Sequence, residues 1–175
     1  VHYLACGMSA PTTALWSQAI HVLRYLKLTR EAKLTYRKNG NLIRTIMTLP
    51  DMNYSHDVIC AFSDSNHGIE HSLASSVLMM YGAALMWRTK KLKRATLSIV
   101  EAELAAATLC SQDCEYARDL LQWIGFKMNE PTTMFIDNRG AIQNALHPSY
   151  SDKLRHVDHK IFYIREVVAR RAVTV

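Results

Sequence analysis

The run Val58-Ile59-Cys60-Ala61-Phe62-Ser63-Asp64 predicts a β-strand that ends at a carboxylate. A second run, Thr133-Met134-Phe135-Ile136, is followed by Asp137 in the same way. A third acidic residue, Glu103, lies in an alanine-rich stretch that predicts a helix. Two carboxylates at strand ends and one on a packed helix form the arrangement that a two-metal phosphodiester-cleaving site needs, because Mg²⁺ prefers oxygen ligands.

The composition is that of an ordinary globular chain. Of its 175 residues, 49% are apolar and 21% are charged. The formal net charge of +6 and the pI of about 9.2 favour a polyanionic partner. The four cysteines show no disulfide framework, so we expect an intracellular, cytoplasmic protein. No signal peptide is visible, and the longest weakly polar stretch, residues 74–87, is shorter than the roughly 20 residues that span a bilayer.

The first part of the chain has an organisation of its own. Pro11-Thr12 precedes apolar residues that recur with helical period, which predicts an amphipathic helix of about four turns. Asn39-Gly40 lies between two short apolar runs and predicts a hairpin. Residues 49–57 have the composition of a loop. We therefore predict a segment 1–50 and a separate domain 57–175.

The remaining sequence carries strand and helix signals in turn. Three strands come first, then a long helix closed by Gly125 as a C-cap, then a further strand and two shorter helices. This order predicts an α/β fold in which helices pack on a mixed sheet. The predicted strands are 58–63, 75–80, 84–87, 132–136 and one that opens at 172, and the predicted helices are 98–124, 139–146 and 157–170.

Glu101 and Glu103 compete for the third carboxylate position. Side chains two positions apart on a helix point in directions about 200° apart, so only one of the two glutamates faces the strand ends. Glu103 shares a helix face with small residues that we expect to pack against the sheet. Glu101 lies in the first turn, where an acid suits the helix dipole. We therefore place Glu103 in the site, and we note that Asp137 has a competing role as an N-cap.

Several stretches share their order and spacing with one known family. They are Ala61-Phe62-Ser63-Asp64, Trp87-Arg88-Thr89-Lys90-Lys91, Ala95-Thr96-Leu97-Ser98-Ile99-Val100-Glu101-Ala102-Glu103-Leu104-Ala105-Ala106, Phe135-Ile136-Asp137-Asn138-Arg139-Gly140-Ala141-Ile142, and Arg155-His156-Val157-Asp158-His159-Lys160 leading into Phe162-Tyr163-Ile164-Arg165-Glu166. Together they resemble the RNase H domain of Ty1/copia-type retrotransposon polyproteins. The stretch from Pro11 to Lys27 resembles the segment that joins the reverse transcriptase to that domain. The resemblance covers nearly the whole chain.

The resemblance implies an RNase H-like fold and cleavage of the RNA strand in RNA–DNA hybrids. It implies that Asp64, Glu103 and Asp137 are the catalytic, metal-binding carboxylates for two Mg²⁺ ions, for which Mn²⁺ can substitute. The implied partners are the hybrid and the reverse transcriptase portion of the same polyprotein, with no membrane. An active element would carry the chain in a virus-like particle.

The sequence also departs from the family pattern. The family places a fourth carboxylate beyond the last strand, and this chain stops at Val175, so we expect a domain truncated at its C-terminal end. Asp158 opens a helix and is better explained as an N-cap. The family's Trp-Ala-Gly after the first aspartate is here Ser65-Asn66-His67-Gly68. The alternative function is therefore a catalytically inactive relic that binds nucleic acid or is structural.

Basic and polar side chains suggest where a nucleic acid would bind. We expect a loop at residues 90–93 whose lysines either contact phosphates or are simply solvated. The candidate nucleic-acid-binding residues are Lys90, Lys91, Asn138, Lys153 and Arg155.

Two further groups have plain structural explanations. Trp16, Trp87 and Trp123 are predicted to be core anchors rather than stacking platforms for bases. Cysteines 110 and 114 and histidines 156 and 159 could together form a zinc site, but the two pairs are too far apart in sequence for a compact finger.

Overall fold

A computed structural model describes residues 2–36, 59–68, 72–93, 96–146 and 158–175. The chain divides into two compact units, Val1–Thr35 and Tyr36–Val175. The predicted hairpin at Asn39-Gly40 and the predicted loop 49–57 lie outside the described residues.

The first unit contains two helices, α1 (His2–Cys6) and α2 (Thr13–Leu28). The Thr12 side chain caps α2 by accepting a hydrogen bond from the Leu15 backbone at 3.2 Å. The predicted amphipathic helix is therefore present, whereas the short α1 was not predicted. No residue of α2 is buried.

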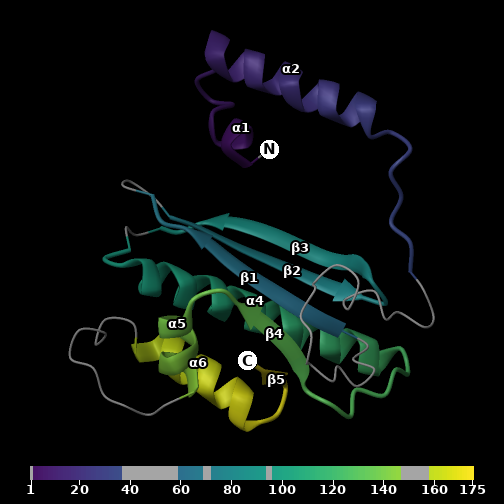
Figure 1. Ribbon diagram of the computed structural model, residues 1–175, viewed down its shortest axis with the longest axis vertical. Coiled ribbons are helices and arrows are strands. Elements are labelled where there is room, and N and C mark those ends of the chain that lie inside the picture. The colour runs from purple at the N-terminus through teal and green to yellow at the C-terminus, as the bar shows by residue number, and fades with distance from the viewer. Residues whose placement is uncertain (1, 37–58, 69–71, 94–95, 147–157) are drawn as a thin grey trace. The chain divides into compact units, whose positions relative to one another are not determined.

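The second unit is built on a five-stranded mixed sheet with the strand order β3-β2-β1-β4-β5 (Figure 1). The first three strands are antiparallel neighbours, while β1 pairs with β4, and β4 with β5, in parallel. Figure 1 shows the three helices of this unit on one side of the sheet. The elements are β1 (Ile59–Asn66), β2 (Leu73–Met80), β3 (Ala83–Lys91), α4 (Ile99–Trp123), β4 (Thr132–Ile136), α5 (Arg139–Leu146), α6 (Asp158–Ala169) and β5 (Val173–Thr174).

The core lies between the sheet and these helices. Alternate residues of β2 are buried, which is the pattern of a strand with one face on the core. Most of α4 is buried, and its alanines allow the helix backbone to approach the sheet closely. The central buried cluster joins residues of all these elements except β3. The element order and the α/β fold class that the sequence predicted are thus confirmed.

A polar network ties the edge strand β3 to α4. Asp113, which is buried on α4, accepts a hydrogen bond from Ser76 on β2. The same carboxylate forms an ion pair with Arg88 on β3, with a distance of 2.6 Å between Arg88 Nη2 and Asp113 Oδ1. The buried charge therefore has partners from two strands, which also fixes β2 and β3 relative to the helix.

Two glycines end elements as expected. Tyr81 and Gly82 both have positive φ, which is the backbone of a tight two-residue hairpin between β2 and β3. Gly125 has a φ of 95° directly after the end of α4. The Gly125 N–H donates to the carbonyl of Gln122 and the Phe126 N–H to that of Leu121, so the helix ends in a Schellman motif.

The bounds of the first three strands differ from the prediction. β1 does not end at Ser63 but continues to Asn66, which pairs with Leu73, where β2 begins two residues before the predicted start at residue 75. β3 continues to Lys91, so Lys90 and Lys91 lie in a strand and not in the predicted loop. In both places pairing with the backbone of β2 extends the strand over polar residues, and the polar side chains themselves give no strand signal in the sequence.

The prediction that the tryptophans anchor the core is wrong. The exposed fractions are 67% for Trp16, 65% for Trp87 and 84% for Trp123. Trp87 belongs to the edge strand β3 and Trp123 is the last residue of α4, so neither reaches the interior. Smaller side chains on α4 and on the central strands fill the core instead.

Among the described helices, none combines the length and apolar character needed to cross a membrane.

Candidate metal centre

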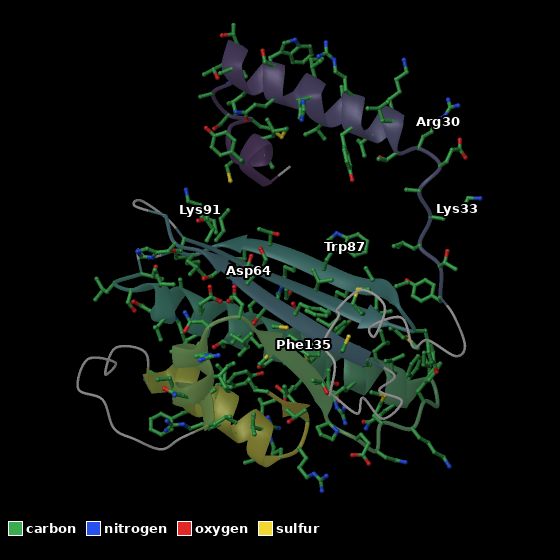
Figure 2. The ribbon with its side chains drawn as sticks, viewed as in Figure 1. Arg30, Lys33, Asp64, Trp87, Lys91 and Phe135 are labelled. Carbon is green, nitrogen blue, oxygen red and sulfur yellow. The ribbon has the colours of Figure 1, made fainter. Side chains whose placement is uncertain are left out.

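Three carboxylates from different elements converge at one end of the sheet. Asp64 comes from β1, Glu103 from the second turn of α4, and Asp137 directly follows β4. One carboxylate oxygen of each residue lies within 4.8 Å of those of the other two. Figure 2 shows Asp64 toward the end of the sheet at which α4 begins. In the described part of the chain, no other group of three His, Cys, Asp or Glu side chains is so placed.

The parallel pairing of β1 and β4 explains why the two aspartates meet. Ser63 lies opposite Ile136, so the residue after each one emerges beside the other. Two positions before the aspartates, Phe62 and Phe135 stack with ring centroids 4.9 Å apart. This stacking on adjacent strands helps to fix the register that brings the aspartates together.

The two glutamates of α4 have separate positions, as the helix phasing predicted. Glu103 joins the carboxylate cluster, whereas Glu101 belongs to the start of the helix. The Glu101 carboxylate accepts a hydrogen bond from the Leu97 N–H at 2.7 Å, and its own N–H donates to Ser98 Oγ at 3.1 Å. Lys160 of α6 also lies 3.9 Å from Glu101. Glu101 therefore caps the helix and balances its dipole.

Glu103 is the buried member of the cluster, with an exposed fraction of 4%, while Asp64 and Asp137 are exposed. Ser65 Oγ donates a hydrogen bond of 2.6 Å to Glu103 Oε1. The other oxygen, Oε2, is buried and has no hydrogen-bond partner among the described residues. A buried carboxylate oxygen without a partner is costly, and a bound cation would satisfy it.

Burial is the main influence on the ionisation of Glu103, and it raises the pKa of this carboxyl. The hydrogen bond from Ser65 lowers the pKa, while the nearby charges of Asp137 and Asp64 raise it further. The net effect is a raised pKa of Glu103, caused first by burial and then by the two neighbouring carboxylates. The residues thus fit a divalent cation: the donor atoms are all carboxylate oxygens, and their mutual repulsion needs a positive charge.

Asn138, and not Asp137, caps the helix that follows β4. Asn138 Oδ1 accepts a hydrogen bond of 3.0 Å from the Ala141 N–H. The competing explanation of Asp137 as an N-cap is therefore unnecessary, and its carboxylate joins the cluster. A Cβ at Gly140 would lie 3.2 Å from Asn138 Oδ1 and 3.3 Å from Val100 Cγ2, so this turn passes close to the start of α4.

The lysines predicted to bind nucleic acid lie on opposite faces of β3. Lys91 is opposite Leu73 in the register, on the sheet face of Asp64, while Lys90 is opposite Ala74 and points the other way. Both are exposed. Figure 2 shows Lys91 at the same end of the sheet as Asp64. Lys153 and Arg155 lie outside the described residues.

Ser65 is the residue at this site that the sequence prediction missed. Its position directly after Asp64 on an extended strand implies that it points toward α4, where Glu103 lies. The alternation of side chains along the strand would have given this direction, but the strand was predicted to end at residue 63, two residues before Ser65. The zinc hypothesis gains no support, because Cys110 and Cys114 are buried in the core and His156 lies outside the described residues.

Comparison with known proteins gives homologues over the full chain. The chain is 24% identical over 175 residues to the retrovirus-related Pol polyprotein from transposon RE2 of Arabidopsis thaliana. The matched region covers 100% of this chain and 11% of that polyprotein. It is 31% identical over 87 residues to the retrovirus-related Pol polyprotein from transposon TNT 1-94 of Nicotiana tabacum, covering 50% of this chain and 6% of that protein. The chain thus spans about a tenth or less of the curated relatives that it matches. Its homologues are Ty1/copia-type Pol polyproteins.

A solved structure confirms the fold. LC11-RNase H1, isolated from compost by a metagenomic approach, is similar with a TM-score of 0.53 and 15% sequence identity, covering 67% of this chain and 81% of that chain. No family model matches the sequence. The mixed sheet with its packed helices is therefore an RNase H-like fold.

Proposed function

We propose that the second unit cleaves the RNA strand of RNA–DNA hybrids, as part of a retrotransposon reverse transcriptase polyprotein. The observation that carries this proposal is the convergence of Asp64, Glu103 and Asp137 within 4.8 Å on an RNase H-like sheet. The Pol homology supports the reverse transcriptase as a partner.

In this proposal the three carboxylates hold two Mg²⁺ ions, for which Mn²⁺ can substitute. Such ions supply an activated water and stabilise the leaving oxygen of a phosphodiester. Glu103 holds the cluster from its buried side, and Asp64 and Asp137 present their carboxylates on the exposed side. A phosphate therefore approaches from the side of the two aspartates.

Charge decides whether a phosphodiester can bind at this place. Three carboxylates within 4.8 Å repel a phosphate, so the metal-free cluster should exclude nucleic acid. The chain as a whole carries a net charge of +6, and Lys91 lies on the sheet face of Asp64. We propose that these basic groups attract the hybrid through its phosphates, and that Asp64, Glu103 and Asp137 would hold the ions whose positive charge offsets this repulsion.

The test is cleavage of a labelled RNA–DNA hybrid with and without Mg²⁺ or Mn²⁺. We expect metal-dependent cleavage by the wild-type chain and none by Asp64→Asn, which keeps the size of the side chain but removes its charge. Glu101→Gln is the matched control, because this residue caps α4 outside the cluster and should leave cleavage unchanged. Cleavage that survives Asp64→Asn would contradict the proposal. Hybrid binding without cleavage by the wild-type chain would favour the inactive, nucleic-acid-binding alternative.

A further inference from the structure

The two oxygens of Glu103 have different surroundings. Oε1 accepts the 2.6 Å hydrogen bond from Ser65 Oγ, and Oε2 is buried without a partner among the described residues. The hydrogen bond therefore leaves one oxygen of this carboxylate for a metal ion. Ser65 is not itself one of the three converging ligands.

Ser65 is held in place by the strand in which it lies. It lies near the end of β1, where it pairs with Ala74 of β2, which is fully buried. Just beyond it, His67 Nδ1 and Thr96 Oγ1 are 2.8 Å apart, and the Thr96 hydroxyl also contacts Ser72 Oγ at 2.6 Å. These contacts join the end of β1 to the segment before α4. Both partners of the hydrogen bond therefore lie in regular elements, Ser65 in β1 and Glu103 in α4, and not in a loop.

We propose that Ser65 is a positioning residue that makes Glu103 a one-oxygen ligand and thereby favours Mg²⁺ over Ca²⁺ at the carboxylate cluster. Mg²⁺ requires a small octahedral site and takes single oxygens from carboxylates. Ca²⁺ accepts six to eight oxygens and often binds both oxygens of one carboxylate. The hydrogen bond from the Ser65 hydroxyl to Oε1 hinders binding of Ca²⁺ by both oxygens of Glu103. It leaves Oε2 for binding of Mg²⁺ by a single oxygen. This inference rests on the proposed function for the identity of the metal site.

The experiment measures metal binding by titration calorimetry with MgCl₂ alone and with CaCl₂ alone, on the full chain stripped of metal. The variants are Ser65→Ala, which removes the hydroxyl, and Ser65→Thr, which keeps it. Ser111→Ala is the matched control, because its hydroxyl donates to the Ala107 carbonyl at 2.9 Å within α4. The heat of binding that Asp64→Asn loses is the part that belongs to the carboxylate cluster. Metal-free melting curves verify that each variant is folded.

We expect Ser65→Ala to lose Mg²⁺ affinity on the order of tenfold, which is typical when a group that orients a metal ligand is removed. Its Ca²⁺ affinity should fall less, so the preference for Mg²⁺ over Ca²⁺ decreases. Ser65→Thr and Ser111→Ala should keep the wild-type preference. Equal Mg²⁺ affinity and preference in wild type and Ser65→Ala would overturn the role of Ser65.

Cleavage assays on the same proteins separate this inference from the proposed function. A wild-type chain that cleaves hybrids, together with unchanged metal binding in Ser65→Ala, overturns only the role of Ser65. A wild-type chain whose Mg²⁺ affinity depends on Ser65 but which never cleaves hybrids supports the role of Ser65 and contradicts the nuclease. A wild-type chain that binds neither ion overturns both.

Discussion

At the scale of single residues, Glu103 shows how a functional group can work against the fold that carries it. Its carboxylate is buried beside two other carboxylates, and one of its oxygens has no partner among the described residues. Burial and the neighbouring charges raise its pKa, so the folded chain holds this proton more strongly than the unfolded chain does. Without metal, the stability of the fold therefore falls as the pH rises from the pKa of Glu103 in the unfolded chain to its raised pKa in the folded chain.

Glu103→Gln should consequently stabilise the metal-free protein. Glutamine removes the buried charge, and we expect a gain of about 1 kcal/mol in the free energy of unfolding. The gain should be larger near pH 8 than near pH 4, because Glu103 is neutral in both the folded and the unfolded chain at low pH. Urea denaturation in the presence of EDTA at the two pH values measures it.

The same variant should lose the stabilisation that Mg²⁺ gives to the wild type, because ligand binding to the folded state is what raises stability. Glu101→Gln is the control, since this residue caps α4 and should gain nothing. A Glu103→Gln protein that is less stable than wild type in EDTA would contradict this account of the cluster.

At the scale of elements, the strand register decides which side chains share a face. The two strand-end aspartates meet because β1 and β4 are parallel neighbours. The same register places Lys91 on the face of Asp64 and directs Lys90 away from it. Adjacent lysines in the sequence are therefore not equivalent in the structure.

Lys91→Gln should weaken binding of an RNA–DNA hybrid more than Lys90→Gln does. A phosphate contact contributes to the salt dependence of binding, so Lys91→Gln should reduce the slope of log K against log salt by about 1. Fluorescence anisotropy with an uncleavable hybrid at several salt concentrations measures both effects. Equal effects of Lys91→Gln and Lys90→Gln on hybrid binding would show that the sheet face of a lysine does not decide whether it contacts a phosphate.

A partly buried polar contact joins α6 and the residue after it to α4. Tyr163 Oη donates to Glu115 Oε2, and Arg170 Nη2 lies 2.7 Å from Glu115 Oε1. Burial, and then the hydrogen bond to Glu115, raise the pKa of Tyr163 above its ordinary value. This residue therefore contributes stability that is complete below about pH 10, the pKa of an unfolded tyrosine, and is lost as the pH rises through the folded pKa.

Tyr163→Phe should lower the free energy of unfolding by about 1 kcal/mol at pH 7, because the Glu115 carboxylate loses a hydrogen bond. The difference from wild type should shrink above about pH 10, where the unfolded wild-type chain releases the phenolic proton. Thermal or urea unfolding at both pH values tests this. Tyr116→Phe on the exposed side of α4 is the control and should behave as wild type.

At the scale of the whole molecule, the two units differ in how much they bury. The second unit has a continuous core between its sheet and helices. In the first unit, α2 has no buried residue, and large apolar side chains such as Trp16 and Leu23 are exposed. Since burial of apolar surface is the main source of stability, the core of the second unit dominates the stability of the chain.

Removal of residues 1–35 should therefore leave the unfolding temperature of the second unit nearly unchanged. Melting curves and amide hydrogen exchange on the full chain and on residues 36–175 make the comparison. We expect the same protection of β1, β2 and α4 in both proteins. A large loss of protection in these elements would show that the second unit depends on the first for its stability.

The sequence by itself determined the order of the elements, the α/β class and the three acidic residues, because periodicity and strand-ending carboxylates are local features. Helix phasing was also enough to choose Glu103 over Glu101, since the direction of a side chain on a helix depends only on its position. The ends of β1 and β3 were not predictable in this way, because they depend on backbone partners in β2 that are distant in sequence. The exposure of Trp87 depends likewise on the position of β3 at the edge of the sheet. Only the tertiary structure placed Ser65 against Glu103, because that hydrogen bond joins residues 38 positions apart on two elements that the fold packs together.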